Sequence, residues 1–212
     1  MRAKTVAGIV AMLAAVCSFG AAAWQSRAEA SVDAQALIAL TRETRATYMV
    51  VSSNLVFRPD GTTVREWSAE FHDGILHRVE TPRDRIVADC EAMTGIHLNV
   101  ATVQIDEEPW VARAACGVQA NSTMLSARLG GVRQTRFGPA THLVIIDGTD
   151  IRTYDVAPDG ALIGATITGR DGKKKLVMRA IYYASKVADG IFSATSLGRS
   201  AVPAHLQEQP KP

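Results

Sequence analysis

The chain has 212 residues, of which 47% are hydrophobic, and it carries 23 Lys and Arg against 21 Asp and Glu. This length suffices for one domain with a substantial core and is short for two. The first 30 residues hold three of the basic and one of the acidic residues, so 20 of each follow, and this balance gives no electrostatic reason to expect nucleic acid or an anionic membrane as the partner.

Residues 1–30 have the pattern of an export signal. Arg2 and Lys4 form a cationic start, residues 6–20 carry no charge, and small residues follow. Cleavage is predicted after Ala30, with Ala23 as the alternative. The alternative interpretation is an uncleaved membrane anchor, because a membrane-spanning helix needs about 20 residues and the apolar run is nearly that long. We therefore expect a periplasmic or secreted protein that contacts a membrane only through an uncleaved signal.

Residues 31–46 predict one amphipathic helix, because apolar residues recur at helical spacing and Ser31 is a suitable N-cap. The pattern then changes to that of β-strands separated by turns rich in Gly, Pro and Asp. Strands are predicted at 48–57, 63–72, 75–80, 85–91, 95–100, 123–129, 142–146, 151–156, 161–168 and 176–184. A short second helix is predicted within 106–116, and an irregular stretch follows residue 129.

These elements predict a mainly β (α+β) fold with one N-terminal and one mid-chain helix. Strands joined by two to five residues must be antiparallel, so the sheet is expected to be a large curved meander. Such a sheet has to bury one face, either by curling around a core or by folding against a helical lid. The domain is expected to span 31–203, with a flexible tail at 204–212 that has little apolar content.

Cys90 and Cys116 are predicted to form a disulfide. Cys17 belongs to the signal, and an even pair in an exported chain is typical of a bridge. Two buried free thiols are the alternative. A zinc site is disfavoured, because such sites use closely spaced cysteine pairs.

The order of elements resembles a known fold family. The residues concerned are a hairpin from Tyr48 to Gly74 with a Pro-Asp-Gly-Thr turn, an Arg-Val-Glu-Thr-Pro segment up to Pro82, and paired strands over 151–168 and 174–184. In these features the chain resembles the periplasmic lipoprotein-carrier fold of LolA, the LppX-type lipid binders and the N-terminal domain of RseB/MucB. The resemblance implies a half-barrel whose helix-covered concave face takes acyl chains. The chain departs from the pattern of this family at the pair Cys90 and Cys116 and at residues 106–118.

Catalytic and metal-binding patterns are weak. His72 and His77 flank a tight turn and could face each other around a metal, but a polar pair at a hairpin end is expected to be solvated. The acidic residues at 89, 91 and 106–108 have the charge pattern expected before a helix. The sequence lacks a nucleophile elbow, a zinc-protease motif and a P-loop. We therefore expect no catalytic residue, metal or cofactor, and an unrecognised hydrolase is the third hypothesis.

The leading hypothesis is a non-enzymatic carrier or sensor for a lipid, a lipoprotein or another acylated ligand. Its predicted lining residues are Val50, Leu55, Trp67, Phe71, Leu143, Ile145, Leu162 and Tyr182. Arg128, Arg133 and Arg136, around a Gly-Gly turn, are the predicted contacts to an anionic headgroup. The alternative, from another class, is an RseB-like envelope module that binds a protein and has no ligand cavity.

Overall fold

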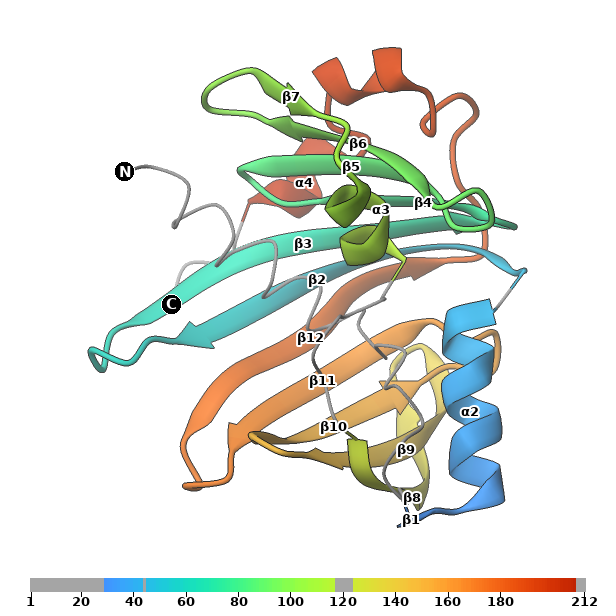
Figure 1. Cartoon of the computed structure of the whole chain (residues 1–212), viewed down its shortest axis with the longest axis vertical. Coiled ribbons are helices and arrows are strands. Elements are labelled where there is room, and N and C mark those ends of the chain that lie inside the picture. The colour runs from blue at the N-terminus through green and yellow to red at the C-terminus, as the bar shows by residue number, and fades with distance from the viewer. Residues whose placement is uncertain (1–28, 44, 117–123, 209–212) are drawn as a thin grey trace.

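The computed structural model describes residues 29–43, 45–116 and 124–208 (Figure 1). Residues 1–28, which carry most of the predicted signal, lie outside this part. Glu29 and Ala30, expected to end the signal, form the short strand β1. Cleavage after Ala23 would retain β1, whereas cleavage after Ala30 would remove it.

Twelve strands of the described residues form one open sheet, which confirms the predicted mainly β fold. They are β1 (Glu29–Ala30), β2 (Thr47–Phe57), β3 (Thr63–Asp73), β4 (Leu76–Glu80), β5 (Asp84–Asp89), β6 (Thr94–Asn99), β7 (Gln104–Asp106), β8 (Met124–Thr135), β9 (Gly138–Asp147), β10 (Asp150–Val156), β11 (Leu162–Gly169) and β12 (Lys174–Ala184). Their order across the sheet is β1-β8-β9-β10-β11-β12-β2-β3-β4-β5-β6-β7.

This order consists of two antiparallel meanders joined side by side. The first runs from β2 to β7 and the second from β8 to β12, and the sheet is continuous because β12 pairs with β2. Between the meanders the chain passes through the short helix α3 (Pro109–Ala115). β1 is the exception to the antiparallel pattern, since it pairs with β8 in parallel.

The stretch expected to be irregular is a β-hairpin. β8 continues to Thr135 and β9 begins at Gly138, with Arg133 opposite Ala140. A register shift lies between Leu129 and Val132, and Gly131 has a φ of 89°. The bulge interrupts the alternation of apolar and polar residues by which a strand is recognised in sequence. β7 was also missed, since three residues carry too little pattern.

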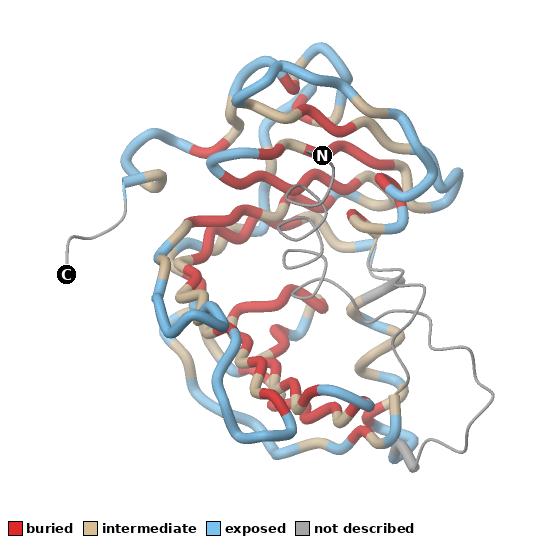
Figure 2. The backbone as a smooth tube through the Cα atoms, turned by 60° about the vertical axis from the view of Figure 1, so that its left-hand side comes forward, coloured by how far each residue is buried: buried red, intermediate tan, exposed pale blue. Residues whose placement is uncertain are grey.

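The sheet has an inner face, which carries helices α2 (Val32–Glu43) and α3, and an outer face (Figures 1 and 2). Register relates the faces of neighbouring strands: Val50 lies opposite Glu70, and Glu70 opposite Val79. Val79 packs against α3, so all three residues belong to the inner face. Figure 2 shows that the second meander curves toward α2.

Glycine at position 95 allows α3 to approach the sheet closely. A Cβ there would lie 3.1 Å from Val111 Cγ1 and 3.2 Å from the Ala112 nitrogen. The predicted disulfide is present, and it ties Cys116, directly after α3, to Cys90, directly after β5. Helix α3 is thus held at its middle by packing and at its C-terminal end by a covalent bond.

The outer face of the first meander is covered by the C-terminal segment, residues 187–207. It contains a 3-10 helix, η1 (Ala194–Gly198), and helix α4 (Ala204–Gln207). Ile191, Val202 and Leu206 pack against the outer residues of β2 and β3. The fold therefore continues beyond residue 203, because Leu206 finds an apolar surface there. No helix in the described part of the chain has the length and apolar character needed to cross a membrane.

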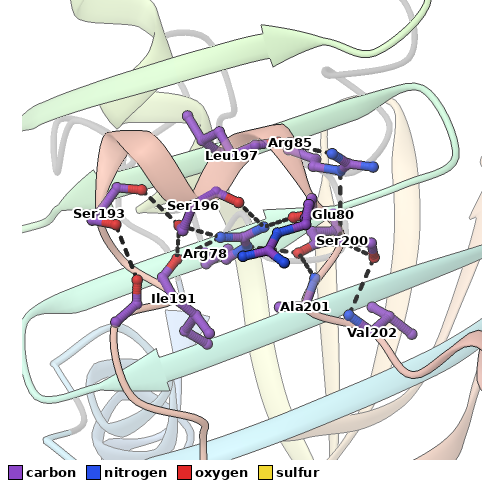
Figure 3. Close-up of polar contacts among 12 residues, drawn as sticks. Arg78, Glu80, Arg85, Ile191, Ser193, Ser196, Leu197, Ser200, Ala201 and Val202 are labelled. Carbon is purple, nitrogen blue, oxygen red and sulfur yellow. Dashed lines mark hydrogen bonds and ion pairs between the residues drawn. The ribbon is translucent and has the colours of Figure 1, made fainter.

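A buried ion pair fixes this segment to β4 (Figure 3). Arg78 Nε donates to Glu80 Oε1 at 2.6 Å, and neither side chain is exposed. The rest of the Arg78 guanidinium donates to the carbonyl oxygens of Ile191 and Arg199 and to the hydroxyl of Ser196. Glu80 in turn accepts hydrogen bonds from Ser200 Oγ and the Ala201 backbone nitrogen.

Candidate functional site: the inner face of the sheet

The second meander supplies an apolar surface to the inner face. Its residues come from five strands and from α2, and we call them the apolar floor. They are Ala34, Ala127, Leu143, Ile145, Tyr154, Val156, Leu162, Ala165, Ile167, Leu176 and Met178. Leu37 and Ile38 of α2 are only half-buried, and they pack against this floor together with Val56 of β2. Helix α2, with 12 residues, thus covers the apolar floor in the part of the chain that the structure describes.

The first meander continues the inner face with polar side chains. On β3 the inner positions are Glu66, Ser68, Glu70 and His72, and Ser52 and Asn54 lie beside them on β2. All of these residues except Glu66 and Glu70 are buried. Asn54 Nδ2 donates to Ser68 Oγ at 2.7 Å. Polar side chains therefore enter the inner face where β12 meets β2, beside apolar residues such as Val50 and Val79.

Glu70 lies at the centre of the polar half. It accepts hydrogen bonds from Tyr48 Oη at 2.7 Å and from His77 Nε2 at 2.9 Å. Burial opposes the ionisation of this carboxyl, but the charge and hydrogen bond of His77 and the hydrogen bond of Tyr48 outweigh it, so the pKa of Glu70 is lowered to about 2. Glu70 is therefore a carboxylate at neutral pH.

The two histidines next to Glu70 reach helix α3 and the residue before β2. His77 Nδ1 lies 2.5 Å from the carbonyl oxygen of Ala115, the last residue of α3, and His72 Nδ1 lies 2.9 Å from that of Ala46, shortly after α2. Since both nitrogens of His77 face acceptors, a doubly protonated ring satisfies both. The pair faces across β3 and β4 as predicted, with ring centroids 5.2 Å apart. It is buried, contrary to the prediction of a solvated pair, and its ring nitrogens meet the backbone of Ala46 and of Ala115 at the end of α3.

Burial, followed by the charge of His77, lowers the pKa of His72. His72 also stacks on Tyr48, with ring centroids 5.2 Å apart. No group of three or more possible metal ligands gathers anywhere in the residues that the structure describes.

A third histidine, His97, lies between two carboxylates under α3. Its ring nitrogens lie 2.9 Å from Asp84 Oδ1 and 3.3 Å from Asp106 Oδ2, and Trp110 meets the ring edge-on. Burial lowers the pKa of His97, but the hydrogen bonds and charges of the two carboxylates outweigh this effect and raise it overall. With 0% exposure and both nitrogens engaged, the ring has no atom left for a substrate.

The predicted lining residues lie on both faces of the sheet. Leu143, Ile145 and Leu162 belong to the apolar floor, and Val50 lies on the inner face in a neighbouring cluster. The other four do not join them. Trp67 and Phe71 pack under the C-terminal segment, while Leu55 and Tyr182 lie opposite the outer residues Arg65 and Val51.

The reason for this division is the alternation in β3. Its apolar residues were expected to line the concave side, but the C-terminal segment covers them on the outer face, which leaves Glu66, Ser68, Glu70 and His72 inside. The signal that could have revealed this was the apolar segment Ile191–Phe192, which needs a surface of its own.

The three predicted headgroup arginines lie on the β8–β9 hairpin, and all are exposed. Arg136 donates to the Ala180 carbonyl oxygen at 2.8 Å and lies over the Phe137 ring, 4.6 Å from its centroid. Arg133 is 3.9 Å from Asp155, and Arg128 lies on β8 before the bulge. Two of the three thus have partners within the protein, at different places.

No family model and no curated protein matches the chain. Among solved structures, an uncharacterized conserved protein from Thermus thermophilus is similar at a TM-score of 0.52, with 14% identity over 82% of this chain and 97% of that chain. A LolA superfamily protein from Nitrosomonas europaea has a TM-score of 0.42 at 10% identity, over 79% of this chain and 100% of its own. MucB also has a TM-score of 0.42, at 12% identity, and 79% of this chain spans 64% of its length. The chain therefore shares the fold of the Thermus protein, and the open antiparallel sheet with helices on its inner face is the architecture that the resemblance implied.

Proposed function

We propose that this protein is an exported, non-enzymatic carrier or sensor that holds an acyl chain on the inner face of its sheet. The observation that carries the proposal is the apolar floor: its residues from β8 to β12 form a continuous apolar surface, and α2 covers it with half-buried Leu37 and Ile38. A helix held mainly by apolar contacts can be displaced by a ligand that offers the same contacts. The proposed location is the periplasm or the exterior of the cell.

The first test is native mass spectrometry of the chain purified from a periplasm, before and after organic extraction. We expect an added mass of a few hundred daltons that is lost on extraction and returns when a single-chain lipid is added. A bare protein mass that takes up no added lipid would contradict the carrier function.

A matched pair of variants on α2 tests the location of the site. Leu37→Gln places an amide at the apolar floor, whereas Ala36→Gln places the same group on the exposed side of the helix. We expect Leu37→Gln to reduce lipid uptake several-fold and Ala36→Gln to leave it unchanged. Equal uptake by both variants would place the lipid elsewhere.

The second candidate function is a protein-binding envelope module, and a feature of the first meander favours it. β7 is an edge strand of the sheet. Its residue Ile105 is 60% exposed, and Val103, just before the strand, is 75% exposed. Edge strands can accept a strand from a partner. If the chain takes up no lipid, pull-down from an envelope fraction with wild type and with Ile105→Lys as control would test this function.

A further inference from the structure

Asn54 lies at the border between the two halves of the inner face. Val56, its neighbour on the same side of β2, packs on the apolar floor, and Met178, opposite Asn54 on β12, belongs to that floor. On the other side, Ser52 and Ser68 begin the polar half. An apolar chain that lies on the floor therefore has one end within reach of Asn54.

The side chain of Asn54 is buried and incompletely satisfied. It is 6% exposed, its Nδ2 donates to Ser68 Oγ at 2.7 Å, and its Oδ1 has no hydrogen-bond partner among the residues that the structure describes. A buried acceptor without a partner loses its hydrogen bonds to water and gains none in return, which is unfavourable. Native structures rarely keep such an atom, and a ligand that donates to it removes the cost.

The surroundings of Asn54 select the charge of such a ligand. Glu66 lies opposite Asn54 on β3, and Glu70 follows on the same side of that strand. Glu66 is already paired with Arg83, and Glu70 with His77. An anionic headgroup would meet acidic side chains whose cationic partners are engaged, whereas an uncharged donor would meet no repulsion.

We propose that Asn54 Oδ1 accepts a hydrogen bond from an uncharged hydroxyl or amide headgroup of a single-chain lipid whose acyl chain lies on the apolar floor. This inference rests on the proposed function and adds the headgroup class to it. It moves the headgroup site from the predicted arginines to the junction of β12 and β2.

The test compares three lipids with the same acyl chain on the delipidated full-length exported protein. Monooleoylglycerol offers hydroxyl donors, oleamide offers an amide donor, and methyl oleate offers none. We expect the wild type to bind the donor lipids about tenfold more tightly than methyl oleate, the ratio that corresponds to about 1.4 kcal/mol. The two donor lipids distinguish a glycerol-type from an amide-type headgroup.

Two variants assign the preference to Asn54. Asn54→Leu with Ser68→Ala replaces both members of the polar pair by apolar groups and should abolish the preference while methyl oleate still binds. Ser68→Ala alone keeps Oδ1 and should retain it. Without ligand, the double variant should have a midpoint of thermal unfolding at or above that of wild type, since the unsatisfied acceptor is gone.

The outcomes separate the two proposals. Binding of all three lipids with equal affinity, or an unchanged preference in the double variant, overturns the Asn54 site and leaves the carrier function standing. Failure of every lipid to bind overturns both.

Discussion

Glu70 shows what a single buried carboxylate requires. It keeps its charge because Tyr48 and His77 both donate to it, and His77 is positioned by the end of α3. The charge of Glu70 and the attachment of α3 thus both depend on the ring of His77. Replacing one of these side chains should therefore affect both the electrostatics of the inner face and the attachment of α3.

Glu70→Gln should destabilise the protein in a pH-dependent way. The pKa of Glu70 falls from 4.5 in the unfolded chain to about 2 in the fold, so its stabilisation is present above pH 4.5 and is lost as the pH falls toward 2. At about 1.4 kcal/mol per pKa unit, the wild type should exceed the variant by roughly 3 kcal/mol at pH 6. Urea unfolding at pH 6 and pH 3 measures this difference; an equal difference at both values would contradict it.

His97→Gln should give the opposite dependence on pH. The pKa of His97 is raised, so its contribution is present below about pH 6.5 and is lost as the pH rises through the folded pKa. The difference in unfolding free energy between wild type and variant should therefore be larger at pH 5.5 than at pH 9. His72, whose pKa is lowered, is common to both proteins and cancels in this comparison. A difference that grows with pH would refute the assignment.

Helix α3 combines three attachments of different kinds. Val111 and Ala115 pack on the sheet, His77 meets the carbonyl of Ala115, and the disulfide fixes Cys116. Helix α2 has 12 residues, and no disulfide attaches it to the sheet in the part of the chain described. We therefore expect α2 to yield to a ligand more readily than α3.

Cys90→Ala with Cys116→Ala should cost about 3 kcal/mol of unfolding free energy, because a bridge spanning a sequence separation of 26 restricts the unfolded chain by that amount. Amide hydrogen exchange should increase first in α3. Reduction of the wild type serves as a second route to the same state. Unchanged exchange in α3 would mean that packing alone holds the helix.

Predictability from sequence also differs between elements. The hairpin at Gly61 and the run of short turns predicted most strands, because turn residues and alternation act locally. Which face of β3 is inside could not be predicted, since Trp67 and Phe71 would suit either face until the chain near Ile191 is known to cover them. The burial of His72 and His77 could not be predicted for the same reason: their contacts, Ala46 and Ala115, lie 26 and 38 residues away in sequence.

The molecule as a whole is a sheet covered on both sides by different means. Apolar contacts dominate under α2, whereas the outer cover adds the buried pair of Arg78 and Glu80 to its apolar contacts. An ion pair of this kind adds little net stability but fixes the partner that it binds. The position of the C-terminal segment is therefore expected to depend strongly on two residues of β4.

Arg78→Met should cost up to about 3–5 kcal/mol, because it removes the closer counter-charge of buried Glu80 and leaves Arg85, 3.9 Å away, as its cationic neighbour. Adding Glu80→Gln should restore part of this loss, since the amide can still accept from Ala201. Limited proteolysis should cut the C-terminal segment faster in the single than in the double variant. Equal stability and equal cleavage of the two variants would argue against a charge effect.

The pairing of β12 with β2 also sets an order of assembly. Residues 47–106 contain a complete meander with local pairings, but one side of β2 has to wait for β12, which is made last. Among the strand pairings, closing the sheet joins the residues that are farthest apart in sequence, and separation of this kind slows folding. A chain delivered from its N-terminus would present the open edge of β2 while the 116 residues between Phe57 and Lys174 are delivered. The unpaired edge of β2 would be most open to wrong strand pairing during that interval.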